Sequence, residues 1–312
     1  MCNPLRERFD EWKDWLRGDD VHSIRSQIHN MIWDSAVYQS INEARAYAPT
    51  DDKGQVELNA MVHHFIDRCF FDTQMMAIRR FLDKETRSGD RSVISLWRLL
   101  DDVEKNIALL TRENLLACLD LPYDYERVKE DVLKRYTFTN GPRLMGDDYK
   151  QCVLAENVHE YMDALADVDS SQRSPSDTVR ETIIQWLKVK LEGCRAVYGY
   201  VNKFLAHSAT PESRAQLPDD ETKITLGQIL HAHEVICQIA AFIGQNLFLR
   251  SIGNPLPIPQ FDQFQHFEKP WVTVEALQKL YEWWRGYEES TNQWLKWDWE
   301  TEYAAHDVGS NG

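Results

Sequence analysis

Residues 174–207 form the longest stretch of this 312-residue chain with one hydrophobic period, and that stretch constrains the fold most. Apolar side chains recur in it every three or four residues, which is typical of a helix that buries one face. Ser174, Pro175 and Asp177 match a helix start, with a capping serine, a proline in the first turn and a carboxylate three residues after the cap. The sequence therefore predicts one uninterrupted helix, about 50 Å long at about 1.5 Å per residue.

The same period recurs through most of the chain, and no stretch sustains the alternation of apolar and polar residues that a half-buried strand requires. A capping box, in which Thr225 and Gln228 exchange hydrogen bonds, predicts the start of one late helix. The sequence therefore predicts an all-α fold. The remaining expected helices span residues 5–16, 21–47, 55–84, 92–110, 123–136, 149–168, 225–249 and 273–299.

The helical pattern stops near residue 250, where a stretch with several prolines begins. The sequence predicts three parts of the chain. Residues 1–250 are expected to form a helical bundle. Residues 251–302 begin with four prolines and are expected to form an extended strap and a tryptophan-rich helix, both packed on the bundle. Residues 303–312 are expected to be a disordered tail.

Tryptophan is concentrated at the C-terminal end, where six of the eleven tryptophans fall between Trp271 and Trp299. So many large apolar rings predict extensive burial. Either they pack within the chain, or they form an interface with a protein partner.

Charge and cysteine usage indicate a cytoplasmic protein. A net charge of −15 argues against broad non-specific binding to nucleic acid. The six cysteines form no Cys-x-x-Cys pair, which suits a reducing compartment. The amino terminus lacks the apolar segment of a signal peptide, and the most apolar stretch, residues 235–249, is too short to span a bilayer. We therefore expect no membrane association.

Motifs for cofactors are absent, since the chain has no P-loop and no dinucleotide-binding glycine pattern. His63 and Asp67 lie four residues apart and could share a metal ion, but no second pair completes such a site, so core or surface roles are expected. We predict neither a metal nor a cofactor. Arg79 and Arg80 belong to a basic patch beside a loop, which we interpret as a solvated turn.

Lys203 and His207 lie four residues apart, so a helix places both side chains on one face. A neutral histidine can transfer a proton near pH 7, and a neighbouring ammonium can hold a phosphate oxygen. The same pair is also common at helix ends, where both side chains contact the last carbonyl groups. From Arg173 to Arg214 there are seven basic and four acidic residues, so this stretch is locally basic.

The segment Asn202-Lys203-Phe204-Leu205-Ala206-His207-Ser208 resembles the motif helix of HEPN-domain proteins, and most closely their abortive-infection branch. Residues 95–113 are also similar to that branch. The resemblance implies an all-helical bundle, commonly dimeric, and in many members a metal-independent ribonuclease. In the family an arginine precedes the polar residue, and four to six residues separate that arginine from the histidine. Positions 200 to 202 of this chain hold no arginine.

Lys203 or Arg195 are the candidates within this stretch to replace the missing cation. Arg195 lies about 120° around a regular helix from His207, so it would contribute across a dimer. Arg98 or Arg112, on a neighbouring helix, are further candidates.

The resemblance predicts an RNA-cleaving effector of a defence or toxin–antitoxin system, acting as a homodimer. His207 would transfer protons, Lys203 would contact phosphate, Asn202 would orient the site and Arg195 would bind substrate. Two alternatives remain open. One is a HEPN-like binding or scaffold protein that has lost catalysis with the arginine, and the other is an unrelated helical protein.

Overall fold

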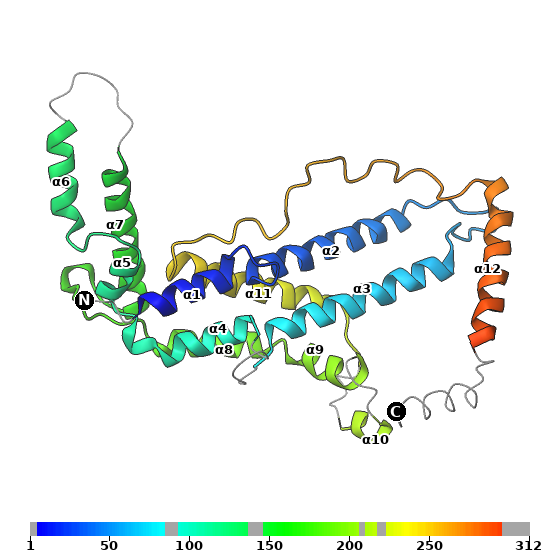
Figure 1. Cartoon of the computed structure of the whole chain (residues 1–312), viewed down its shortest axis with the longest axis horizontal. Helices are drawn as coiled ribbons and strands as arrows, with labels where there is room; N and C mark the ends of the chain where they lie inside the picture. Colours follow the sequence, from blue (N-terminus) through cyan, green and yellow to red (C-terminus); the bar gives the residue numbers. More distant parts are fainter. Residues whose placement is uncertain (1–4, 85–92, 137–145, 206–209, 217–222, 295–312) are drawn as a thin grey trace, which may run out of the picture. The chain divides into compact units, whose positions relative to one another are not determined.

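The computed structural model describes residues 5–84, 93–136, 146–205, 210–216 and 223–294 (Figure 1). Within these ranges the chain is helical and contains no strand, only two isolated β-bridges, Thr50 with Val56 and Thr111 with Thr178. The prediction of an all-α fold is confirmed. The chain divides into two units, Met1–Pro257 and Ile258–Gly312, so the boundary falls seven residues after the expected one.

The first unit contains eleven of the α-helices of the described ranges (Figure 1). They are α1 (Arg6–Arg17), α2 (Ile24–Arg45), α3 (Ala60–Phe81), α4 (Leu96–Lys105), α5 (Arg112–Cys118), α6 (Tyr125–Tyr136), α7 (Asp147–Ala166), α8 (Glu181–Glu192), α9 (Arg195–Tyr200), α10 (Pro211–Arg214) and α11 (Leu226–Asn246).

Helix α11 lies in the middle of the core and packs against α2, α3, α7 and α8. The predicted capping box of Thr225 and Gln228 is present at its start. The helix is long and apolar enough to cross a bilayer by length and composition alone, but 44% of its most apolar window is buried inside the bundle. Such burial is what the central helix of a folded bundle requires.

The predicted single helix over residues 174–207 is wrong. Residues 174–180 are not helical, and α8 begins only at Glu181. The helix then breaks at Gly193 and Cys194, resumes as α9, and ends in a π-helical turn, Val201–Leu205. Local capping residues suggested an earlier start, but tertiary contacts to α5 hold this segment extended, as described below.

Other helix ends also differ from the expected ones. Asn59 caps α3 by accepting a hydrogen bond from the Val62 backbone N–H at 3.0 Å, so α3 starts five residues later than predicted. Helix α4 starts after the capping residue Ser95 and ends at Lys105. The expected loop after residue 208 contains the short helix α10.

The second unit is described from Ile258 to residue 294 and contains turns followed by α12 (Val274–Trp294). Its aromatic side chains are exposed, with values of 64% for Phe261, 82% for Trp271 and 61% for Trp283. Packing of this unit on the bundle stays a prediction. The expected helix end beyond residue 294 and the expected tail lie outside the described residues.

His233 of α11 provides a test of core burial. Its side chain is 4% exposed, and its Nε2 atom has no hydrogen-bond partner in the described parts of the chain. Desolvation lowers the pKa of this imidazole from 6.5 to about 4. The folded state therefore binds a proton less readily than the unfolded state.

We expect His233 to make stability fall as the pH drops from about 6.5 toward 4. At about 1.4 kcal/mol per pKa unit, the loss is roughly 3 kcal/mol. The free energy of unfolding, measured with urea at several pH values, should fall less steeply with decreasing pH for His233→Met than for the wild type. The exposed His231→Gln should show the same dependence on pH as the wild type. Equal slopes for all three proteins would contradict the assignment.

Candidate functional site

The candidate site is built around the π turn, Val201–Leu205, which holds Asn202 and Lys203. Turns of this kind are rare inside helices and occur frequently at functional sites. Val201 is fully buried and anchors the turn in the core, whereas Asn202 and Lys203 are half-buried. The turn therefore presents two polar side chains from a fixed backbone.

An arginine from another helix contacts Asn202. Arg79, in the last turn of α3, donates a hydrogen bond from Nε to Oδ1 of Asn202 at 3.0 Å. Its guanidinium also lies over the Tyr198 ring, 5.6 Å from the ring centroid. The neighbouring Ile78 is fully buried, so the helix turn that carries Arg79 is firmly packed. Arg79 thus contacts Asn202 from 123 residues upstream.

Lys203 and the aromatic residues near it contact α10. The Lys203 ammonium donates to Oγ of Ser213 at 2.7 Å. The Arg214 guanidinium lies 5.7 Å from the Phe204 ring centroid, and Phe204 stacks on Tyr200 with ring centroids 4.6 Å apart. Three cations therefore lie at the π turn: Lys203 belongs to it, and Arg79 and Arg214 contact it. A stack of two aromatic rings, Tyr200 and Phe204, lies beside them.

The other predicted site residues are placed differently. His207 lies outside the described residues, so its role stays a prediction. Arg195 pairs with Glu192 at 2.6 Å, in the turn before α9, and Glu192 also pairs with Lys84 at 2.9 Å. No contact joins Arg195 to Asn202 or Lys203 in the described ranges, and its role in substrate binding also stays a prediction.

Neither arginine considered on the neighbouring helix reaches the π turn. Arg98 donates to the Val93 carbonyl oxygen at 2.6 Å, and its guanidinium lies over the Trp15 ring at 4.3 Å. Arg112 is fully buried and is held by two carboxylates, those of Asp163 and Asp177, each at 2.8 Å.

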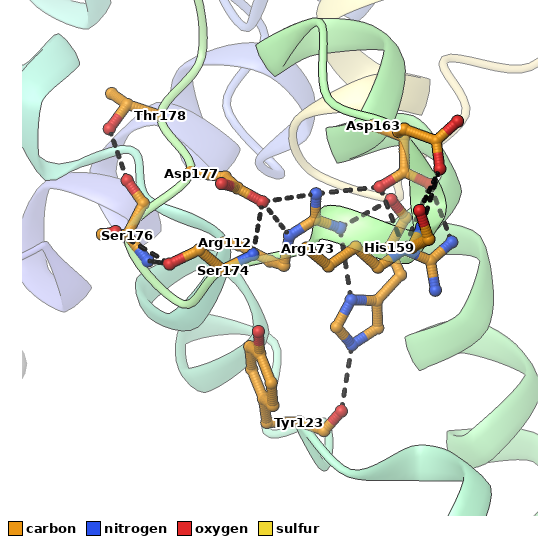
Figure 2. A network of polar contacts seen from close by, with 11 residues as sticks. Arg112, Tyr123, His159, Asp163, Arg173, Ser174, Ser176, Asp177 and Thr178 are labelled. Atoms are coloured by element: carbon orange, nitrogen blue, oxygen red, sulfur yellow. Dashed lines mark hydrogen bonds and ion pairs between the residues drawn. The ribbon is translucent and has the colours of Figure 1, made fainter.

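Figure 2 shows the polar cluster around Arg112, which we call the Arg112 network and define as Arg112, His159, Asp163, Arg173 and Asp177. Arg112 lies between the two aspartates and donates through NH1 to the His159 carbonyl oxygen at 2.8 Å (Figure 2). Arg173 binds the outer side of Asp163 at 2.7 Å. Every charged group in the network faces a partner of opposite charge.

The pKa shifts of the network follow from this pairing. Desolvation alone would raise the pKa of Asp163, but hydrogen bonds from Arg173 and Arg112 outweigh it and lower the pKa. Desolvation lowers the pKa of His159, whose Nε2 faces the Tyr123 carbonyl oxygen at 3.0 Å. Asp163 is therefore ionised and His159 neutral near pH 7, and both carboxylates of the network already face arginines. We interpret the network as structural.

His63 and Asp67, weighed above as metal ligands, hold an arginine. Arg45 donates to Nδ1 of His63 at 3.1 Å and pairs with Asp67 at 2.7 Å. The described ranges contain no group of three His, Cys, Asp or Glu side chains with the geometry to bind a metal ion.

Comparison with known proteins adds no assignment: no protein-family model, no curated protein and no solved structure matches this chain. The function must therefore be argued from the site.

Sequence reasoning noted Arg79 only as part of a basic patch and did not connect it to Asn202. The one signal was its place near the end of a helix with a buried apolar face. Nothing in the sequence alone indicated which residue that helix end would contact.

Proposed function

We propose that the chain is a metal-independent, HEPN-type RNA-cleaving effector of a defence or toxin–antitoxin system. The observation that carries the proposal is the hydrogen bond from Arg79 to Asn202. The HEPN motif, which residues 202–208 resemble, requires a cation beside its polar residue. In this chain Arg79 has that position, although it belongs to a different helix.

Arg79 retains the donors that phosphate binding needs. Its Nε is used on Asn202, and no hydrogen bond from its two terminal nitrogens is made to any described residue. The two terminal nitrogens of a guanidinium match the bidentate geometry of a phosphate. Lys203 supplies a second cation once its bond to Ser213 is exchanged for a phosphate oxygen.

The chemistry of the proposal is cleavage of a phosphodiester bond. The 2′-hydroxyl of RNA attacks the adjacent phosphorus, and the bond from phosphorus to the 5′ oxygen breaks. His207 transfers the protons to and from these oxygens. Arg79 and Lys203 stabilise the negative charge that develops on the phosphate, and Asn202 fixes the Arg79 guanidinium.

The proposal includes the oligomeric state and the cellular location of the protein. A cytoplasmic homodimer would bring two π turns together and double the local positive charge, against a chain whose net charge is −15. The exposed aromatic side chains of α12, among them Trp284 at 55% and Tyr287 at 52%, would then serve a protein partner.

The second candidate is a binding or scaffold protein without catalysis. Two contacts favour it, since Arg79 and Lys203 both already have side-chain partners, Asn202 and Ser213. Under this reading the cations stabilise the π turn, and the exposed face of α12 carries the function.

RNA cleavage in EDTA separates the two candidates. The wild type is expected to cut labelled RNA without a divalent metal, and His207→Ala is expected to lose about two to four orders of magnitude in rate, the usual contribution of general acid–base catalysis. Circular dichroism and light scattering should show the same fold and oligomeric state for both proteins. A folded wild type that cuts no RNA would favour the binding protein.

A further inference from the structure

A cavity of about 570 Å³ lies between α2 and α3, on a part of the molecule that the proposed function does not use. The two helices pack against each other and run in opposite directions (Figure 1). Gln27, Met31 and Asp34 line one wall at helical spacing, and Met76 and Arg80 line the other. Its volume is within the range of small-molecule sites.

The acidic end of this cavity holds Asp34 and Asp72. Neither carboxylate forms an ion pair or hydrogen bond with any described residue. Desolvation by the surrounding protein raises the pKa of Asp34, although the residue stays exposed. Two carboxylates at one end of a cavity favour a cationic group there.

The basic end holds Arg80 and His22. Arg80 is exposed and makes no ion pair or hydrogen bond within the described ranges. A second cavity of about 370 Å³ adjoins this end and is also lined by Arg80, with Asp20 and Asp83. Asp20 accepts a hydrogen bond from the His22 backbone N–H at 2.6 Å, but a single backbone donor does not neutralise a carboxylate, so Asp20 and Asp83 both compete with an anion for Arg80.

Between the two ends the lining is mixed, since Met31, Met76 and Ala77 are apolar whereas Gln27, Asn30 and Thr73 are polar. Asp72 and Arg80 are eight residues apart on α3, which is about 12 Å along the helix axis. Helical side chains lean toward the amino end, so the Arg80 guanidinium approaches Asp72 more closely than that. A ligand that contacts both ends needs a short apolar chain between its charges.

We propose that this cavity binds a small zwitterionic molecule whose ammonium group lies at Asp34 and Asp72 and whose anionic group lies at Arg80. Its methylene chain lies on Met76 and Phe81. The site is independent of RNA cleavage and has no part in the chemistry at the π turn.

Isothermal titration of the full chain tests the site with three probes of matched length: ε-aminohexanoate, hexylamine and hexanoate. The zwitterion is expected to bind at least about tenfold more tightly than either single-ended probe, because each charged end adds a charge-assisted hydrogen bond. Asp34→Asn and Arg80→Gln should each weaken binding of ε-aminohexanoate by about tenfold or more.

Two variants outside the cavity serve as controls, Glu160→Gln on α7 and Arg68→Gln on α3, and both should bind like the wild type. Thermal unfolding midpoints establish that every variant is folded. Hexylamine that binds as tightly as ε-aminohexanoate would overturn the proposal, because the anionic end would then contribute nothing. Undetectable binding of ε-aminohexanoate by the folded wild type would overturn it as well.

Discussion

Replacing Arg79 with glutamine is expected to slow RNA cleavage by about two to three orders of magnitude, the usual cost of removing one group that stabilises developing charge. Glutamine still reaches Asn202 with an amide N–H, so the π turn keeps a partner for Oδ1. What is lost is the positive charge and the two terminal nitrogens. The measurement is kcat/KM on a labelled RNA in EDTA, beside the wild type.

Arg68→Gln is the matched control for Arg79→Gln, since Arg68 lies on the same helix, is exposed and contacts the Phe65 ring. It should cleave RNA at the wild-type rate. If Arg79 served only packing, Arg79→Gln would lower the unfolding midpoint and leave the cleavage rate of the folded protein unchanged. That result would favour the non-catalytic binding protein.

Replacing Arg112 with methionine is expected to lower the free energy of unfolding by about 3–5 kcal/mol, the usual cost of removing one partner from a buried ion pair. Arg112 is fully buried and holds two carboxylates. Asp163 keeps Arg173 in the variant, but Asp177 loses its paired cation while only 10% of its side chain is exposed. Urea unfolding at pH 7 measures the loss.

Two further variants define the origin of that loss. Arg112→Lys keeps the charge but has one nitrogen in place of a planar fork, so it should recover only part of the stability. Arg127→Gln removes an exposed arginine whose pair with Asp124 is long, at 3.8 Å, and it should leave the unfolding midpoint unchanged. A stable Arg112→Met protein would show that the network adds nothing to the fold.

Most of the helices could be predicted from the sequence, because they carry apolar residues with a period of 3.6 residues, but the short helices α5 and α10 were not expected. The start of α11 was correct in detail, since its capping box involves residues only three positions apart. The start of α8 was wrong for the opposite reason. Ser174 and Asp177 form a local bond, the Ser174 backbone N–H donating to the Asp177 carboxylate at 2.9 Å. Yet Arg112 donates its backbone N–H to the Asp177 carbonyl oxygen at 2.8 Å and keeps the segment extended.

The site could be predicted only in part. Asn202 and Lys203 were found because they belong to one short motif, but the arginine that contacts them could not be. Arg79 is 123 residues away from Asn202, and nothing local marks the pairing. A one-dimensional motif search counts positions along one helix. Such a search cannot find Arg79, because Arg79 belongs to another helix.

The Arg112 network also bears on the order in which the chain folds. The bond from Arg112 to Asp177 closes a loop of 65 residues, and such distant contacts form late because chain entropy opposes them. Until α5 and α7 have formed, Ser174 and Asp177 are free to start a helix of their own. The network thus acts as a noncovalent crosslink that prevents a helix from starting at Ser174. The residue at which α8 begins is therefore set by the assembly of distant segments.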